Sequence, residues 1–299
     1  MIFWRIVDNQ LHPVQETDNL GFEESEGLRI PDEYLDTREF VVMRTAHGIG
    51  DWGIISAMPR LLKEKYSNCK VYLPSSKLLK KLFSEYEKNW STWNAPFENV
   101  NTIFDNNPYV DGYKDDVEGE IFHDHYRIYD KDNVDIPLVE QILKFWQFGD
   151  YEYKDSQPEI YWSKEERELG DGIIREYVGD REFGCLLVSN RIGTQFGKHI
   201  EENYKSEVKK IKDILLKNKL SYFYWIYKPI EYTPFNFIDT ALDIRNINFR
   251  IQMYIRCKAV LNIGNQSGAL QLSTRYSSTY DIQRQFPIGH NFVRGEVCI

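Results

Sequence analysis

The residues best suited to chemistry lie in the glycine-rich segment 48–53, Gly-Ile-Gly-Asp-Trp-Gly, between an apolar run and a helical pattern. Asp51 is an acid on this strand-to-helix loop, and His47 stands beside it. A carboxylate held there by a rigid scaffold can point into a crevice and act as a general base. A second interpretation is that Asp51 only caps the helix, while Gly48 and Gly50 ease a tight turn. Both interpretations stay open at this point.

The same segment matches the G-x-G-x-x-G pattern of dinucleotide-binding folds. Two features count against a bound dinucleotide. Asp51 places a negative charge where the pyrophosphate would approach the helix N-terminus. The predicted strand at 70–74 ends in Pro74 and Ser75, with no acid there to hold a ribose hydroxyl. We therefore expect no dinucleotide cofactor.

These residues depend on elements that alternate between short apolar runs and helical patterns, which is typical of parallel α/β sheets. In the first half the predicted strands are 40–45, 70–74, 101–104 and 120–125, and the predicted helices are 54–66, 75–86 and 137–148. In the second half the predicted strands are 184–190, 221–227, 259–264 and 278–282. The predicted helices there run from a Ser163–Glu166 capping box to about residue 177, and over 204–219, 248–257 and 267–276.

This alternation predicts two Rossmann-like domains in sequence. We expect an N-terminal extension over residues 1–38, a first domain over 39–160 and a second over 161–299. The carboxyl edges of two such parallel sheets are the usual place for a ligand crevice.

Composition narrows the partners and the compartment. The 299 residues carry a formal net charge of −9, which makes nucleic acid or an anionic membrane a poor default partner. The N-terminus lacks the apolar stretch of a signal peptide, and no run approaches transmembrane length. The four cysteines are widely spaced, without a C-x-x-C pair. We expect a cytoplasmic protein that does not insert stably into a membrane.

Two segments could hold a metal ion, but each has a plainer interpretation. His123 and His125 would share one strand face, yet no third ligand is placed by spacing. Asp130 and Asp132 form a literal D-x-D in a chain rich in aspartate, which we interpret as a solvated loop. The sequence therefore predicts no metal site.

Four segments in order along residues 40–275 resemble glycosyltransferase family 9, the heptosyltransferase-like enzymes: 44–73, 104–113 with its Asn-Pro-Tyr-Val-Asp motif, 137–166 and 258–274. The resemblance implies a GT-B fold, with two Rossmann-like domains whose parallel sheets face across a cleft. It implies inverting, metal-independent transfer from a nucleotide-diphosphate sugar to a hydroxyl acceptor on a glycan or saccharide, with no resident cofactor. The first domain would hold the acceptor and the second the donor.

The resemblance also implies roles for particular residues. Asp51 matches the family's catalytic base. Lys198 matches the basic residue that binds the donor phosphates, with Arg191 in reserve. Backbone amides after the strand 259–264 would receive the diphosphate, as free N–H groups at a helix start favour an anion; these belong to Asn265, Gln266, Ser267 and Gly268. Glu231, after the strand 221–227, could hold a donor ribose or be a surface carboxylate.

Two departures from the family bear on the donor and on the activity. The family usually has an acid where Gln266 stands and a histidine where Gln271 stands. These departures keep two alternatives open: a non-catalytic module that binds a nucleotide sugar or glycan, and a GT-B-like epimerase of sugar nucleotides.

Overall fold

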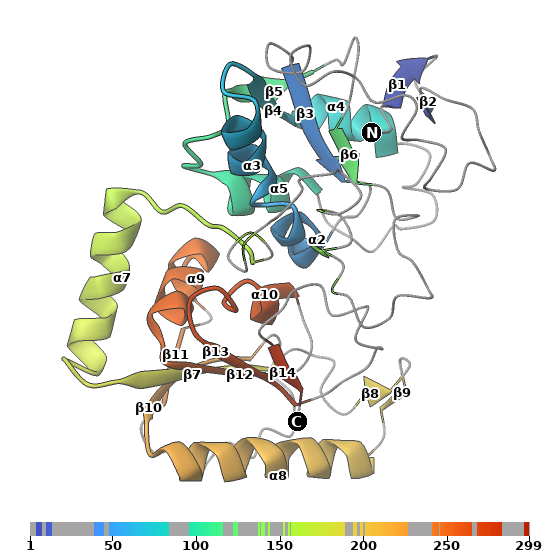
Figure 1. Cartoon of the computed structure of the whole chain (residues 1–299). Coiled ribbons are helices and arrows are strands. Elements are labelled where there is room, and N and C mark those ends of the chain that lie inside the picture. Colours follow the sequence, from blue (N-terminus) through green and yellow to red (C-terminus); the bar gives the residue numbers. More distant parts are fainter. Residues whose placement is uncertain are drawn as a thin grey trace. The chain divides into compact units, whose positions relative to one another are not determined.

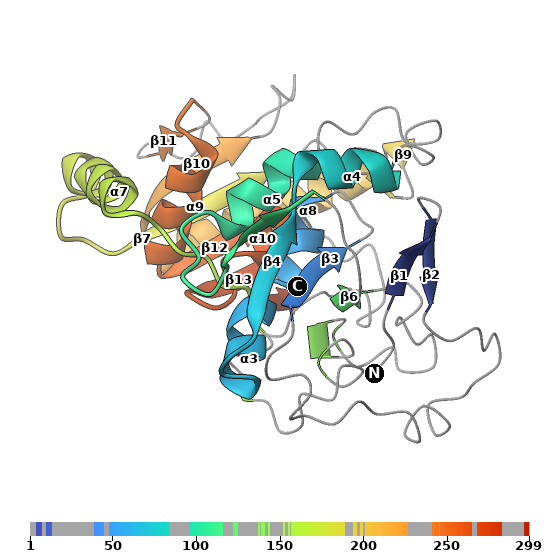
Figure 2. The ribbon, with the colours of Figure 1, turned by 90° about the horizontal axis from the view of Figure 1, so that it is seen from above.

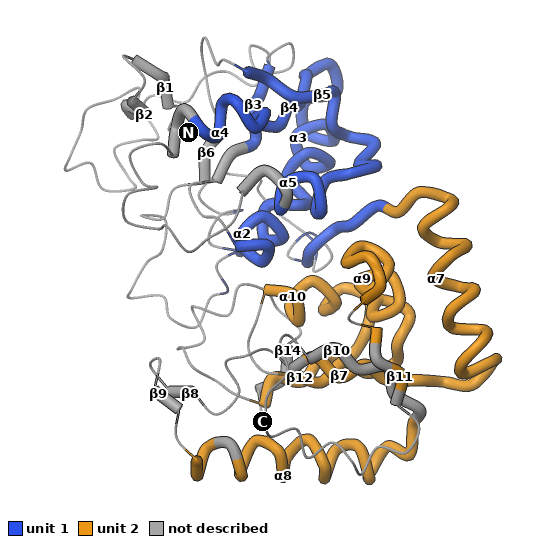
Figure 3. Tube along the Cα trace, turned by 180° about the vertical axis from the view of Figure 1, so that it is seen from behind, with its two compact units in different colours: residues 1–161 blue, residues 162–299 orange. Residues whose placement is uncertain are grey.

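The computed structural model divides the chain into two compact units, residues 1–161 and 162–299 (Figure 3). The residues it describes are 4–7, 10–13, 39–44, 48–83, 96–115, 122–124, 137, 139–140, 143, 152, 155, 157–188, 194–195, 198–199, 201–226, 241–244, 246–264, 268–282 and 296–298. Each unit is built on a parallel sheet, and each is described by itself.

Unit 1 contains a four-stranded sheet in which every described pairing is parallel. Its strands are β3 (Glu39–Arg44), β4 (Lys70–Pro74), β5 (Gly112–Lys114) and β6 (Phe122–Asp124), in the spatial order β5-β4-β3-β6. Figures 1 and 2 show β3 and β4 side by side. A separate antiparallel pair joins β1 (Trp4–Val7) to β2 (Gln10–Pro13). The strands predicted at 40–45 and 70–74 are confirmed by β3 and β4. They could be recognised because buried parallel strands are apolar runs in the sequence.

The helices of unit 1 correct one prediction. They are α2 (Ile49–Ile54), α3 (Met58–Lys65), α4 (Ser76–Phe83) and α5 (Pro96–Phe104). The single helix predicted over 54–66 is wrong, because α2 ends at Ile54 and α3 begins at Met58. Pro59 explains the break, because it has no N–H to donate to the carbonyl four residues back and its ring clashes with that carbonyl. It is tolerated in the first turn of a helix, where it lies in α3. Ser75 caps α4, because its Oγ accepts the Leu78 N–H at 3.1 Å.

The strand predicted at 101–104 is also wrong, because these residues form the last turn of α5. The buried residues Val100, Ile103 and Phe104 have the i, i+3, i+4 spacing of a helix face. A four-residue apolar run cannot distinguish a strand from a helix by itself. In the helix predicted over 137–148, the described residues Val139, Glu140 and Leu143 are helical and buried, and most of the rest lie outside the described part.

Unit 2 contains a six-stranded sheet in which every described pairing is parallel. Its strands are β7 (Phe183–Val188), β10 (Ser221–Ile226), β11 (Ala241–Asp243), β12 (Leu261–Gly264), β13 (Ser278–Asp281) and β14 (Glu296–Cys298). Their spatial order is β11-β10-β7-β12-β13-β14. Numbered along the chain this is 3-2-1-4-5-6, the order of the dinucleotide-binding Rossmann sheet.

The remaining elements of unit 2 are α7 (Lys164–Tyr177), α8 (Glu201–Asn218), α9 (Phe249–Lys258), α10 (Gly268–Gln271) and the antiparallel pair β8 (Thr194–Gln195) and β9 (Lys198–His199). The capping box is confirmed: Ser163 Oγ accepts the Glu166 N–H, and Glu166 accepts the Ser163 N–H. The helix predicted over 267–276 is shorter than expected, because it gives way to turns after Gln271.

The core of unit 2 lies on both faces of its sheet. Leu186 of β7 packs with Ile211 and Leu215 of α8, whereas the neighbouring Cys185 packs with Ile251 and Ile255 of α9. Adjacent strand residues point to opposite faces, so α8 and α9 cover opposite sides (Figure 1). Unit 2 is therefore a three-layer α/β unit.

Candidate functional site

Asp51 lies in the first turn of α2, directly after the central strand of unit 1. Its Oδ2 atom accepts the Gly48 N–H at 3.0 Å, and its own N–H donates to the Gly48 carbonyl at 3.0 Å. Asp51 therefore caps the N-terminus of α2. A carboxylate has two oxygens and about four acceptor positions, so capping a helix does not prevent it from accepting a proton. The role of Asp51 as a base stays a prediction.

The helix that carries Asp51 is fixed on its other face. Trp52 is fully buried and meets Phe104 of α5 edge to face, with ring centroids 6.3 Å apart. At the end of α2, Ser56 Oγ donates to the Gly53 carbonyl at 2.5 Å and accepts the Glu159 N–H at 2.8 Å. Asp51 itself is half-buried. A rigid scaffold of this kind is what a positioned catalytic group requires.

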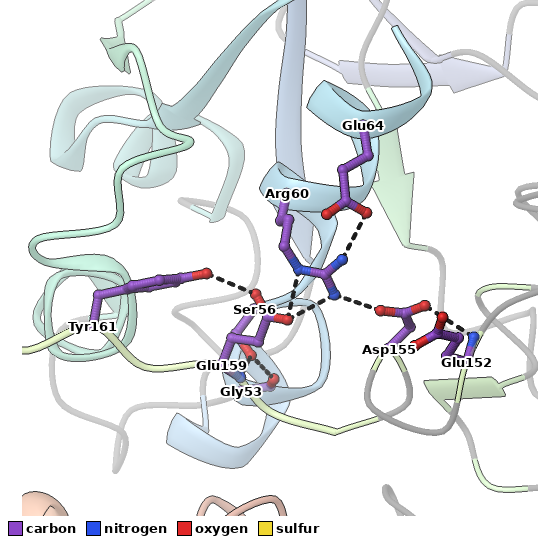
Figure 4. A network of polar contacts seen from close by, with 8 residues as sticks. All are labelled: Gly53, Ser56, Arg60, Glu64, Glu152, Asp155, Glu159 and Tyr161. Carbon is purple, nitrogen blue, oxygen red and sulfur yellow. Dashed lines mark hydrogen bonds and ion pairs between the residues drawn. The ribbon is translucent and has the colours of Figure 1, made fainter. Parts of the chain in front are cut away.

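A buried polar network follows α2 and was missed by sequence reasoning (Figure 4). Arg60 donates from Nη2 to Asp155 at 2.5 Å, from Nε to Glu159 at 2.8 Å and from Nη1 to Glu64 at 2.7 Å. The Tyr161 hydroxyl donates to the second oxygen of Glu159 at 3.0 Å. Burial alone would lower the pKa of Arg60, but the hydrogen bonds to these carboxylates outweigh it and raise the pKa. The network attaches residues 155–159, near the end of unit 1, to α3.

The Asn-Pro-Tyr-Val-Asp motif has a structural role in unit 1. It follows α5, where the sequence predicted a strand at 101–104, and leads into β5. Asp111 accepts the Val71 N–H at 2.8 Å and pairs with Lys63 at 2.6 Å. Burial would raise the pKa of Asp111, but the contacts with Lys63, Val71 and Lys70 outweigh it and lower the pKa. The motif therefore joins α3, β4 and β5.

In unit 1 the strand order changes direction at β3. The chain runs from β3 to β4 on one side and later returns to β6 on the other, where Arg44 is in register with Asp124. Ligands of open α/β sheets bind outside the carboxyl ends of the strands at such a switch point. Gly48 and the first turn of α2, with Gly50 and Asp51, follow the carboxyl end of β3 along the chain. His47 and His125 lie outside the described residues.

Unit 2 has its own switch point between β7 and β12. The two strands are parallel neighbours, with Leu187 in register with Gly264. Gly264 is required by space, since a Cβ built there would lie 2.2 Å from the Leu187 carbonyl oxygen. Both segments expected to bind the donor phosphates leave these strands at the same edge.

The predicted donor residues differ in how far the structure describes them. The backbone of Lys198 lies in β9, and Gly268 is the first residue of α10. The others lie outside the described residues: Arg191, Glu231, Asn265, Gln266 and Ser267. Gln271, at the end of α10, is 2% exposed, and neither atom of its side-chain amide has a hydrogen-bond partner among the described residues.

Among the described residues, no group of three or more His, Cys, Asp or Glu side chains could hold a metal ion. Asp130 and Asp132 fall outside that part of the chain. The helices found in the same part include none that is long and apolar enough to cross a membrane.

No protein-family model matches the sequence, and no curated protein matches it either. Among solved structures, the chain is similar to a glycosyl transferase of family 9 from Veillonella parvula DSM 2008, with a TM-score of 0.55 at 10% identity over 88% of this chain and 85% of that chain. It is also similar to E. coli ADP-heptose lps heptosyltransferase II, with a TM-score of 0.44 at 11% identity over 88% and 90%. For E. coli heptosyltransferase WaaC with ADP the TM-score is 0.44 at 8% identity, over 87% and 92%.

The first of these similarities shows the fold. The chain has the GT-B architecture of two Rossmann-like α/β units, as the sequence predicted, and its resemblance to glycosyltransferase family 9 is confirmed at the level of the fold.

Proposed function

We propose that this chain is a glycosyltransferase that moves a sugar from a nucleotide-diphosphate sugar to a hydroxyl group of a saccharide acceptor. The observation that carries the proposal is the switch point of unit 2, where both segments predicted to bind the diphosphate leave neighbouring strands. The fold shared with a family 9 glycosyl transferase supports the same class. The domain at 39–160 would bind the acceptor and the domain at 161–299 the donor.

Asp51 is the proposed general base, with His47 as a second candidate for proton transfer. As the acceptor oxygen attacks the anomeric carbon, Asp51 takes the hydroxyl proton. The bond between that carbon and the diphosphate oxygen breaks, and the nucleoside diphosphate leaves with the electron pair. A single displacement of this kind inverts the anomeric configuration.

The leaving diphosphate gains negative charge in the transition state. Lys198, with Arg191 in reserve, and the backbone amides of residues 265–268 are the proposed groups that stabilise this charge. Glu231 is the proposed partner of the donor ribose. With these cations and amides the reaction would need no divalent metal ion, and we propose that it proceeds without one in the cytoplasm.

The test begins with the donor. A thermal-shift screen over ADP, UDP, GDP and CDP identifies the nucleobase of the donor, because a bound nucleotide raises the melting temperature by mass action. Nucleotide sugars with that base are then supplied with and without saccharide acceptors. With the donor alone, an epimerase converts it into its epimer, a transferase at most hydrolyses it, and a binding module leaves it unchanged.

Asp51→Asn is the decisive variant. Transfer should fall by about 10²–10⁴-fold, the usual contribution of a general base, while donor affinity stays within a few-fold. Asp180→Asn, which removes the same charge at an exposed position, should behave like the wild type. Turnover of Asp51→Asn within a factor of about two of the wild type would refute the assignment of the base.

A further inference from the structure

We propose that Gly48 is a positioning residue. Because it has no side chain, the Asp51 carboxylate can occupy the space beside the Gly48 N–H. This inference rests on the proposed role of Asp51 as the base. It concerns a backbone N–H and the space beside it, which hold one oxygen of that carboxylate.

The space beside Gly48 is filled by Asp51. A Cβ atom built on Gly48 would lie 2.7 Å from Asp51 Oδ2 and 3.6 Å from its Cγ, and among the described residues beyond its chain neighbours no other atom lies within 4 Å. Real Cβ atoms essentially never come closer than 3.0 Å to another heavy atom, and ordinary contact begins at 3.4 Å. Any side chain at position 48 must therefore push the carboxylate away from the Gly48 N–H.

The backbone gives no other reason for glycine at this position. Gly48 has a φ of −71° and a ψ of 148°, an extended conformation that every residue adopts readily. Glycine is usually required where φ is positive, and that requirement is absent here. The constraint at position 48 is the room that Asp51 occupies.

When that room is reduced, the carboxylate will yield before the helix does. The helix is fixed by the buried Trp52 against Phe104 and by the Ser56 contacts with Gly53 and Glu159. The carboxylate is the far end of a half-buried side chain, so it can change rotamer where the helix cannot move. A methyl group at position 48 should therefore break the capping contact with the Gly48 N–H and displace the proposed base, while the packing of α2 is kept.

Displacement of the base should appear in turnover. An error of about 1 Å in the position of a reacting group can cost on the order of 100-fold in rate. Gly48→Ala should lower kcat by about 10- to 100-fold. The donor KM and the melting temperature should change little, because the donor is bound by the other unit and the fold is kept.

The experiment uses a double-mutant cycle in the full-length chain. Gly48→Ala, Asp51→Asn and the double variant are assayed together. The substrates are nucleotide sugars that carry the nucleobase identified by thermal shift. If Gly48 acts through Asp51, adding Gly48→Ala to Asp51→Asn should cause no further loss. Gly172→Ala is the matched control: a Cβ there meets nothing within 4 Å, so its kcat should equal that of the wild type.

Gly48→Ser guards against a folding defect. Serine is a favoured N-cap residue, so this variant should keep α2 stable and still displace the carboxylate. The same loss of kcat with an unchanged melting temperature supports the proposal. Wild-type kcat in both Gly48 variants, or additive losses in the cycle, would overturn it while Asp51 stays the base. An unaffected Asp51→Asn would instead refute Asp51 as the base, on which this inference rests, and a wild-type chain that transfers no sugar would overturn the proposed function.

Discussion

The segment that connects the two units is held at each end by one arginine, and the two arrangements differ in the carboxylates they bury. Arg60 in unit 1 has a side chain 8% exposed, and its partners Asp155 and Glu159 are 8% and 3% exposed. Arg250 in unit 2 is 9% exposed, but its partner Glu166 is 19% exposed. The two cations are equally buried, so the anions make the difference. Removing the cation leaves two carboxylates buried from solvent in unit 1 and one partly solvent-exposed carboxylate in unit 2.

The two ends also differ in what surrounds the arginine. In unit 1 the network continues through polar contacts, from Glu159 to Ser56 and Tyr161. In unit 2 the contacts are aromatic instead. The ring of Trp162 packs edge to face against Tyr254 and Tyr276, at centroid distances of 5.4 and 5.7 Å. We infer that unit 1 depends on its ion pairs for the attachment of this segment, whereas unit 2 depends more on apolar packing.

The largest effect is expected from Arg60→Met, which keeps much of the volume and removes the charge. Asp155 and Glu159 would then be buried without their cation, and breaking a buried pair in this way costs about 3–5 kcal/mol. Hydrogen exchange of the α3 amides measures the free energy of opening in unit 1, separately from unit 2.

A triple variant tests the cause of that loss. Adding Asp155→Asn and Glu159→Gln to Arg60→Met removes the orphaned charges and should recover part of the stability. A loss below about 1 kcal/mol for Arg60→Met alone would mean that the network contributes no more than a surface pair.

A smaller effect is expected from Arg250→Met in unit 2. Arg250 donates to Glu166 from Nε at 2.5 Å and from Nη2 at 3.0 Å, but water can reach the carboxylate left behind. We expect a loss of about 1–2 kcal/mol, at the lower end for hydrogen bonds to charged groups. Exchange of the α7 amides measures it, with the exposed Arg175→Met as the control on the same helix. Losses equal to those of Arg60→Met would contradict the idea that carboxylate burial sets the cost.

The sequence predicted the central strands of both sheets, because buried parallel strands are continuous apolar runs. It did not predict β5, β11 or β14, which have three residues each and too little pattern to recognise. The break at Pro59 and the helical end of α5 were missed for another reason: a prediction from apolar spacing alone passes over a proline and cannot classify a run of four residues.

The site was predicted in part for similar reasons. Asp51 was found because its loop is a local motif with a chemical meaning. The Arg60 network was not found, because Asp155 and Glu159 lie 95 and 99 residues away in the chain, and only the fold brings them together. The crowding between Gly48 and Asp51 is likewise a matter of distance, which residue types do not reveal.

The smallest effect is expected in the pH dependence of the free energy of unfolding, and it concerns Glu166, the partner of Arg250. Burial would raise the pKa of Glu166, but its hydrogen bonds with Arg250 and with Ser163 outweigh burial and lower the pKa below the ordinary value of 4.5. A carboxyl whose pKa is lower in the folded state binds fewer protons there than in the unfolded state. Its contribution to stability is therefore complete above the unfolded pKa and is lost as the pH falls through the folded pKa.

Glu166→Gln keeps an oxygen that can accept the Ser163 N–H but removes the charge. Urea unfolding from pH 7 down to pH 3 should show a difference of about 0.5–1 kcal/mol between wild type and variant near neutrality, discounted for partial exposure. That difference should hold until the pH nears 4.5 and then shrink steadily, because the wild type alone loses a charged contact. Glu168→Gln, which removes an exposed carboxylate paired with Lys164 at 3.5 Å, should differ little from the wild type throughout. A Glu166 difference that grew as the pH fell would mean that the carboxylate is destabilised by burial and that Arg250 does not compensate it.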